Sequence, residues 1–130
     1  MKLMHLAGVL TLSMMSGAAL AQPTENKGVS TSPISSFELS KQGLKDFDQR
    51  QMRIRQIKLE PGGQAAFHSH AQRPAFTYIL SGTLIEHRKG APDRTYKPGD
   101  VLVESTDVEH WAENTGSEPV VLISVDLFKE

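Results

Sequence analysis

Residues 62–82 read GGQAAFHSHAQRPAFTYILSG, and residues 99–114 read GDVLVESTDVEHWAEN. In an extended strand, residues two apart point to the same face, so His68 and His70 can direct two imidazoles at one point. His110 follows forty residues after His70, and an intervening hairpin can bring it back as a third donor. Three neutral imidazoles that converge form a site for a first-row transition metal. These two stretches therefore predict a metal site built on β-strands.

The rest of the chain after residue 50 reads as short strands separated by Gly- and Pro-containing turns, with no convincing helix. Strand patterns cover residues 52–59, 65–70, 76–80, 83–88, 95–96, 101–104, 109–113 and 120–128, with turns at 61–63, 89–93 and 97–100. Many short strands at this spacing are typical of a β-sandwich or barrel. The sequence therefore predicts an all-β domain.

The first 21 residues have the pattern of a secretory signal peptide. Lys2 precedes a short apolar run from Leu6 to Met15, and Ala19-Leu20-Ala21 is a small-x-small cleavage site. The apolar run is too short to span a membrane. We therefore expect a bacterial protein that is exported to the periplasm or secreted, without stable membrane association after signal cleavage.

Three segments follow from this pattern: a signal peptide over 1–21, a flexible leader that could include a first strand over 22–50, and a barrel over 51–130. Pro, Ser, Thr and Gly are frequent in residues 22–36, which show no hydrophobic period. Residues 37–49 are expected to hold a short strand or a helical turn.

Composition excludes several classes of function. The chain has no cysteine, so thiol catalysis, thiolate metal ligands and iron–sulfur clusters are excluded. It has 14 Lys and Arg against 15 Asp and Glu, and cleavage of the signal removes only Lys2 from this count. Without a basic excess, no nucleic-acid partner is expected. There is also no G-x-S-x-G elbow and no phosphate-binding glycine loop.

The two histidine stretches resemble the cupin superfamily. Its first motif, G-x5-H-x-H-x(3,4)-E-x6-G, is matched by Gly62, His68, His70 and Gly82, and its second, G-x5-P-x-G-x2-H-x3-N, by Gly99, His110 and Asn114. The resemblance covers about residues 52–128. It implies a double-stranded β-helix, which is a jelly-roll barrel. It also implies one divalent transition metal per chain, Fe, Mn, Ni, Cu or Zn, held deep in the barrel mouth by the three histidines.

The sequence departs from the motif at the metal. The motif glutamate falls at Ala75, or at Pro74 with the shorter spacing, and neither side chain binds metal. Ser105 and Asp107 replace the proline and glycine of the second motif. Loss of an anionic ligand is expected to weaken metal binding and to leave one more open position for an anionic substrate or dioxygen.

Glu86 and Arg88 are the candidates for catalytic side chains, but strand parity leaves their orientation open. If the even-numbered face of 83–88 is inside the barrel, both enter the cavity, as an ion pair or an anion-binding site. If the odd-numbered face is inside, His87 becomes an additional imidazole. As a lone histidine beside a turn, His87 is otherwise expected in solvent. Gln72 and Glu104 are weaker replacements for the lost carboxylate, because we expect turns to hold them.

Further candidates surround the predicted metal. Arg73 lies in the loop near the barrel mouth, and Ala75, Thr77 and Ile79 share the strand face of the lost glutamate, so these four are candidates for lining the pocket.

Three other side chains are expected away from the metal. Trp111 neighbours His110, so we expect it to point away from the metal and to pack in the core or in a dimer interface. Arg53 and Arg55 share a strand face and could bind an anionic substrate, although a solvated face explains them more simply.

The leading hypothesis is a metal-dependent, dioxygenase-like oxidoreductase that acts on an unidentified small molecule. The alternatives are a non-catalytic barrel that binds or senses a small ligand, and a metal-free structural barrel. A catalytic site keeps a base or an anion anchor facing the metal, whereas a simple binder has an apolar pocket. A homodimer is expected, because the N-terminal strand region and the apolar final strand, 120–128, are expected to offer sheet edges that small barrels often pair.

Overall fold

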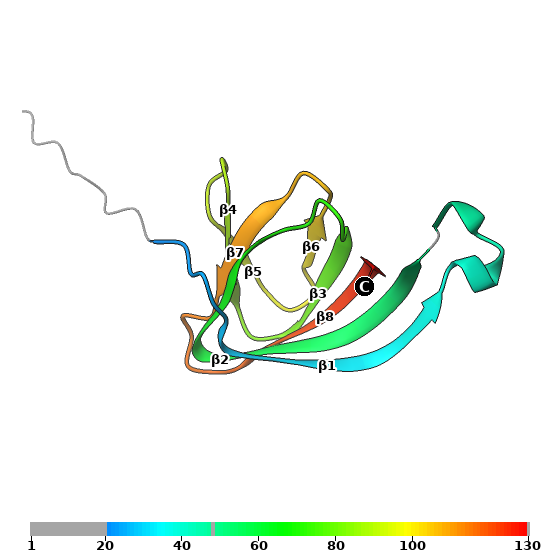
Figure 1. The fold of residues 1–130 in the computed structure, drawn as a ribbon. Helices are drawn as coiled ribbons and strands as arrows, with labels where there is room; N and C mark the ends of the chain where they lie inside the picture. Colours follow the sequence, from blue (N-terminus) through cyan, green and yellow to red (C-terminus); the bar gives the residue numbers. More distant parts are fainter. Residues whose placement is uncertain (1–20, 48, 130) are drawn as a thin grey trace, which may run out of the picture.

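Antiparallel strands dominate the part of the chain that this computed structural model describes, residues 21–47 and 49–129. The elements are β1 (Lys27–Glu38), the short 3-10 helices η1 (Ser40–Gln42) and η2 (Lys45–Phe47), β2 (Arg50–Ser69), β3 (Ala75–Ser81), β4 (Leu84–Arg88), β5 (Arg94–Tyr96), β6 (Val101–Glu104), β7 (Glu109–Glu113) and β8 (Val120–Lys129). The all-β prediction is confirmed (Figure 1). The predicted signal peptide lies outside the described residues except for Ala21.

β2 belongs to both layers of the barrel, which is formed by one folded sheet. Its first half, 50–59, pairs with β8, and its second half, 64–69, pairs with β7. The sequence predicted a turn at 61–63 between two strands, but this segment is a bend within one strand. Gly62 makes the bend with a left-handed φ of 73°, and a Cβ on Gly63 would lie 2.7 Å from the backbone oxygen of Glu60.

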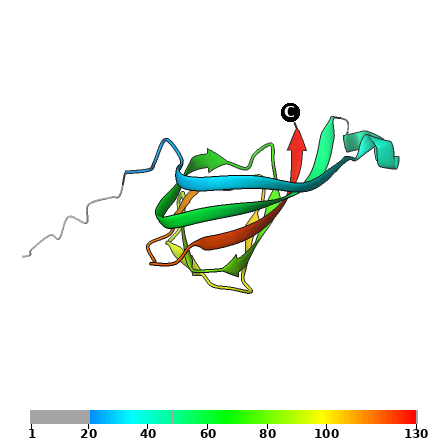
Figure 2. The same cartoon turned by 90° about the horizontal axis from the view of Figure 1, so that it is seen from below.

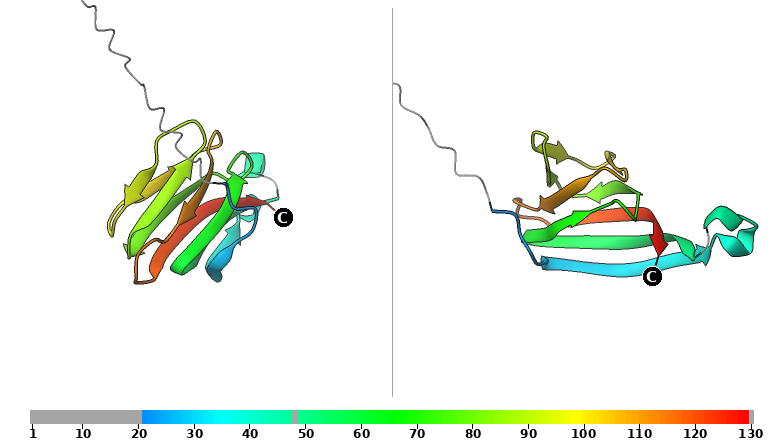
Figure 3. Two further views of the ribbon diagram at one scale, coloured as in Figure 1. Left: turned by 90° about the vertical axis from the view of Figure 1, so that its left-hand side faces the viewer. Right: turned by 45° about the horizontal axis from the view of Figure 1, so that its top comes forward.

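The bend in β2 produces two layers that face each other. One layer has the order β1-β2-β8-β3-β6, and the other has the order β5-β4-β7-β2. Figure 3 shows the long β1–β2–β8 layer lying against the shorter strands β4 and β7. Together the layers form a nearly closed antiparallel barrel, which Figure 2 shows from below.

The barrel interior is apolar at one end and polar at the other. The apolar end is a cluster of eight side chains: Leu59, Ile79, Leu84, Tyr96, Leu102, Ala112, Val120 and Leu122. Burial of each large aliphatic side chain contributes about 1.5–3 kcal/mol of stabilisation. At the other end most of the inward positions are polar. Thr77 lies opposite Ser124, and the two carboxylate residues Asp126 and Glu104 both lie opposite Ala75 in the strand register. The apolar cluster thus anchors strands whose other ends carry the site.

The N-terminal region differs from the sequence prediction. A flexible leader was expected over 22–36, but Lys27–Glu38 forms β1 and pairs along β2 as an edge strand. Nearly all of its side chains are exposed, so its sequence has no hydrophobic alternation. Residues 37–49, expected to hold a short strand or a helical turn, contain the end of β1 followed by η1 and η2. Neither of these helices has the length and apolar character needed to cross a membrane.

The final strand is not at a sheet edge. β8 lies between β2 and β3 and pairs with both. The expectation that 120–128 offers an edge for dimer formation is therefore wrong, since its backbone groups are already paired.

Candidate metal centre

The structure brings His68, His70 and His110 together. His68 lies near the end of β2, His70 follows that strand, and His110 lies on β7 directly opposite His68 in the strand register. The Nε2 atom of His70 lies 3.0 Å from the Nε2 atoms of both other histidines, and those two are 3.2 Å apart. His70 and His110 are buried, and His68 is partly buried. These three nitrogens could hold a metal ion.

The second nitrogen of each imidazole faces a hydrogen-bond acceptor. Nδ1 of His68 lies 2.8 Å from the carbonyl oxygen of Ala66, and Nδ1 of His70 lies 2.9 Å from that of Arg73. Nδ1 of His110 lies 2.6 Å from Oε1 of Glu86. Carbonyl and carboxylate oxygens only accept, so each Nδ1 carries the proton and each Nε2 presents a lone pair. The three lone pairs point at one another.

Burial keeps the imidazoles of His68 and His70 neutral. It lowers the pKa of His68 to about 4 and the pKa of His70 to about 4, because the charged form loses its hydration. Neighbouring positive groups, among them Arg73, lower both values further. Both histidines are therefore neutral at pH 7, as metal ligation requires.

Glu86 and Arg88, the candidates for catalysis, hold His110 in place. The Glu86 carboxylate is fully buried and also accepts hydrogen bonds from Arg88, at 2.8 and 3.1 Å, and from the Tyr96 hydroxyl, at 2.8 Å. Although burial acts to raise the pKa of Glu86, its bonds to His110, Arg88 and Tyr96 lower it to about 2. The even-numbered face of β4 is thus inside the barrel, but neither candidate lines the cavity beside the histidines.

His87 lies on the other face of β4, away from the histidine cluster. Its ring stacks on Trp111 with centroids 3.7 Å apart, and its nitrogens lie 2.9 Å from Asp93 and 3.0 Å from Glu113. The side chain is only 11% exposed, so the expectation of a solvated histidine is wrong. Trp111 is buried in this stack and not on the His110 side, in agreement with the alternation of a strand.

Glu104 provides a carboxylate beside the three histidines. It is the last residue of β6, only 6% exposed, and not in a turn as predicted. Its Oε1 lies 3.5 Å from Nε2 of His110 and 3.7 Å from Nε2 of His70. The Thr77 hydroxyl donates to its Oε2 at 2.9 Å, and burial raises its pKa. Strand alternation from buried Leu102 would have indicated this inward orientation.

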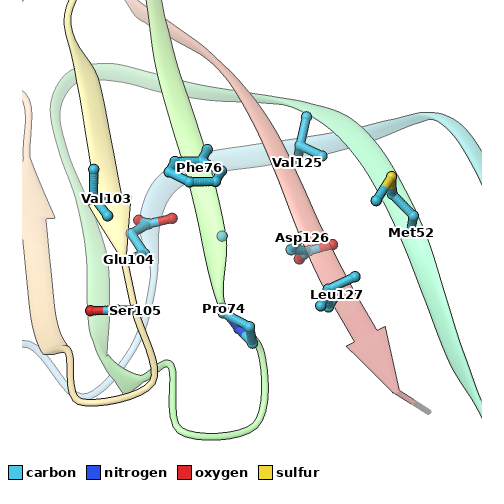
Figure 4. Close-up of a pocket in the computed structure, with 10 residues that line it drawn as sticks. Met52, Pro74, Phe76, Val103, Glu104, Ser105, Val125, Asp126 and Leu127 are labelled. Carbon is cyan, nitrogen blue, oxygen red and sulfur yellow. The ribbon is translucent and has the colours of Figure 1, made fainter. Parts of the chain in front are cut away.

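A small cavity of about 70 Å³ adjoins the histidines. Of the predicted pocket residues, Arg73 and Thr77 line it together with Arg55 and Glu104. Ile79 belongs to the apolar cluster instead. Ala75 borders a separate groove of about 340 Å³, which the histidines do not line. Figure 4 shows this second groove, where Phe76, Val103, Val125 and Met52 from the outer faces of four strands are drawn.

Arg53 and Arg55 are not on a solvated face. Both point inward to the buried carboxylate of Asp126: Arg53 donates at 2.8 and 3.0 Å, and Arg55 donates at 3.1 Å. Arg73 reaches the same carboxylate at 3.4 Å. Sequence reasoning missed Asp126. The inward positions of β8 begin with apolar residues, so the polar Ser124 and Asp126 that continue this face were a signal for a buried polar group.

Comparisons with known proteins agree with the barrel fold. The Cupin domain family model matches residues 55–126. No curated protein sequence matches the chain. Among solved structures, a putative sugar phosphate isomerase from Acidithiobacillus ferrooxidans is 25% identical with a TM-score of 0.55, and the match covers 59% of this chain and 50% of the isomerase. This chain thus spans half the length of that protein.

Two further solved structures match over most of both chains and show the fold alone. A predicted oxalate decarboxylase from Thermotoga maritima is 24% identical, with a TM-score of 0.61 and coverage of 82% of this chain and 93% of that one. An uncharacterized conserved protein with a double-stranded β-helix domain from Klebsiella pneumoniae is 19% identical, with a TM-score of 0.62 and coverage of 89% and 90%. The barrel is therefore a double-stranded β-helix, and the chain belongs to the Cupin domain family.

Proposed function

We propose that this protein is a metal-dependent enzyme, an oxidoreductase of the dioxygenase type that acts on a small molecule at His68, His70 and His110. The observation that carries the proposal is the convergence of three Nε2 lone pairs at separations of 3.0–3.2 Å. Lone pairs repel at this distance unless a cation lies between them. Because all three Nδ1 protons are committed to acceptors, a bound metal ion explains the arrangement best.

The spacing of the nitrogens suits a metal with open positions. Two ligands ~2.1 Å from an ion are about 3.0 Å apart when they subtend a right angle, and about 3.4 Å apart in a tetrahedron. The observed separations are close to the first value. Glu104, 3.5 and 3.7 Å from two of the nitrogens, is placed to add a carboxylate ligand after a small shift. His68, His70, His110 and Glu104 would then hold the ion.

The cavity wall favours an enzyme over a simple binding barrel. Although most of the residues that line the cavity are apolar, Glu104, Arg55 and Arg73 line it together with the histidines, and a simple binder of apolar ligands would not need these charged groups. A divalent ion, when bound, would supply oxygen activation or Lewis acidity. The chain's own residues fix His110 through Glu86 and supply the charges that orient a substrate.

The metal content of the mature protein, residues 22–130, tests the proposal. Protein purified without chelator or affinity-tag metal should contain about one ion per chain, and a His68→Ala/His110→Ala double variant should contain none. His87→Ala is the matched control, since this imidazole lies outside the cluster, and it should retain the metal. Absence of metal from the parent, even after anaerobic reconstitution, would overturn the proposal.

The identity of the ion then separates the chemistries. Iron together with oxygen consumption in the presence of substrate would support the oxidoreductase. Zinc without oxygen consumption would overturn that part of the proposal and favour Lewis-acid catalysis. Non-oxidative reactions are the relevant alternative, because two structural relatives are named as a putative isomerase and a predicted decarboxylase.

A further inference from the structure

Three guanidinium groups surround one buried carboxylate beside the histidine cavity. Arg53, Arg55 and Arg73 all reach Asp126, whose side chain is fully buried. A single carboxylate neutralises one of the three positive charges. Two of the arginines, Arg55 and Arg73, also line the cavity itself. The wall on this side of the cavity therefore carries an excess of positive charge.

Arg55 has a hydrogen-bond donor without a partner. Within the described residues, its Nε is the one buried side-chain nitrogen or oxygen that makes no hydrogen bond. Burial lowers the pKa of Arg55, but a guanidinium stays protonated, so this N–H remains a charged donor. Buried donors of this kind are normally satisfied, because leaving one unpaired is costly. This nitrogen has almost no accessible surface, so a ligand in the cavity would meet the accessible part of the same guanidinium group.

The other charged groups near the cavity do not remove the excess. Glu86 is already paired with Arg88 and His110, and it lies outside the cavity wall. Glu104 is the one further carboxylate in the wall, and it faces the histidine nitrogens. With a divalent ion at the histidines, the net charge of the groups around the cavity is positive even when Glu104 is ionised.

We propose that the substrate of this site is a small carboxylate anion whose carboxylate binds the guanidinium groups of Arg55 and Arg73 while its adjacent carbon lies toward the histidines. This inference rests on the proposed function and names the substrate class. A guanidinium presents donors in a planar fork that fits a carboxylate. The cavity of about 70 Å³ restricts the part of the ligand held there to a few heavy atoms, since a liquid water occupies about 30 Å³.

Titration with lactate and with lactamide tests the proposal, because the two probes differ in the carboxylate charge. Binding is followed by nitrogen–proton NMR of the mature protein, including the arginine Nε–H signals, in the metal-free and zinc-loaded forms at constant ionic strength. Lactate should shift the Arg55 Nε–H signal and bind about tenfold or more tightly than lactamide. Equal binding of the two probes, or no binding of lactate in either form, would overturn the proposal.

Variants locate the binding. Arg55→Gln should weaken lactate binding about tenfold or more. Because loss of Arg55 leaves Asp126 with fewer donors, the more exposed Arg73→Gln serves as a second variant that should also weaken it. Arg50→Gln on the same strand removes the same charge outside the cavity and should leave binding unchanged. Unchanged lactate binding in both cavity variants would contradict the proposal. Inorganic phosphate that binds as tightly as lactate, with the same dependence on Arg55, would also contradict it.

The result is distinguishable from that of the metal experiment. One metal per chain without carboxylate binding would overturn only the carboxylate proposal. Arg55-dependent lactate binding to a protein that takes up no metal would support it and overturn only the metal-dependent function.

Discussion

Glu104 on β6 pairs with Ala75 on β3, and this register places its Oε1 3.5 Å from Nε2 of His110. Ala75 occupies the position where the cupin motif has its glutamate ligand. The carboxylate is therefore absent from β3 but present on the paired residue of the neighbouring strand. A site that reads as three neutral histidines in the sequence has a carboxylate beside it in the structure.

This relationship predicts that Glu104→Gln weakens metal binding by at least tenfold, because it replaces an anionic ligand with a neutral one. Competition with a chromophoric chelator measures the affinity without requiring activity. Glu60→Gln, an exposed carboxylate change on β2, is the control and should have no effect. The double variant Ala75→Glu/Glu104→Gln should recover affinity. Unchanged affinity in Glu104→Gln would show that the carboxylate is not a ligand.

Glu86 is predicted to act on the metal through His110. Its short bond to Nδ1 orients the ring and increases the basicity of Nε2. Glu86→Gln keeps an acceptor for that proton but removes the charge, so metal affinity should fall by about 10- to 100-fold. Tyr96→Phe keeps the charge and removes one of the donors to Glu86, so its effect should be smaller. Equal affinities of all three proteins would contradict this role.

The metal-free protein is predicted to lose stability as the pH falls from about 6.5 to about 4. In the folded state the pKa of His68 and of His70 is lowered to about 4, whereas the unfolded chain has the usual value of 6.5. Between these values the unfolded chain binds more protons, so lower pH favours unfolding. Thermal melts of apoprotein across this range measure the effect.

The matched variant for this pH experiment is His68→Gln/His70→Gln, which should flatten the dependence. Glu104 titrates in the opposite sense because burial raises its pKa, so protonation of Glu104 favours the folded state. The difference between the parent and the double variant therefore isolates the histidines. A parent melting temperature that is constant or rises toward pH 4 would refute the prediction.

The barrel and the histidine cluster followed from local sequence, whereas their surroundings depend on pairing between distant segments. The motif spacing of the histidines reflects the path of two strands, and the turns between strands carry Gly and Pro. By contrast, Arg53 and Arg55 appeared solvated because their partner Asp126 lies 73 and 71 residues away along the chain. Only the register of β2 against β8 brings these three groups together.

Two other differences have similar physical causes. β1 has no hydrophobic alternation because one strand neighbour and solvent surround it, and its pairing with β2 uses backbone groups that every sequence has. Glu104 precedes Ser105 at the end of a four-residue strand, so its place in the strand or the turn could not be assigned from local pattern. Its inward orientation follows from alternation with Leu102 once the strand is known.

Export remains a prediction, which the N-terminus of the expressed protein tests. If 1–21 is a signal peptide, full-length chain expressed in a bacterium should appear in the periplasm or medium and begin at Gln22 by intact mass. Ala19→Asp/Ala21→Asp should block cleavage, because the peptidase requires small residues at these positions. Cytoplasmic protein that still carries Met1–Ala21 would contradict the prediction.

Homodimer formation also remains a proposal, and beside the edge strand β1 we propose the outer face of β3 and β6 as a second surface for it. Phe76 is 61% exposed and Val103 is 53% exposed there, beside the apolar groove of Figure 4. Exposed apolar surface of this kind is typical of interaction sites. Light scattering should give twice the chain mass for the parent and the monomer mass for Phe76→Lys, because a buried unpaired charge opposes association. Thr95→Lys on β5 adds the same charge elsewhere and should remain dimeric. A monomeric parent protein at micromolar concentration would overturn the proposal, and a dimeric Phe76→Lys variant would place the interface on another surface.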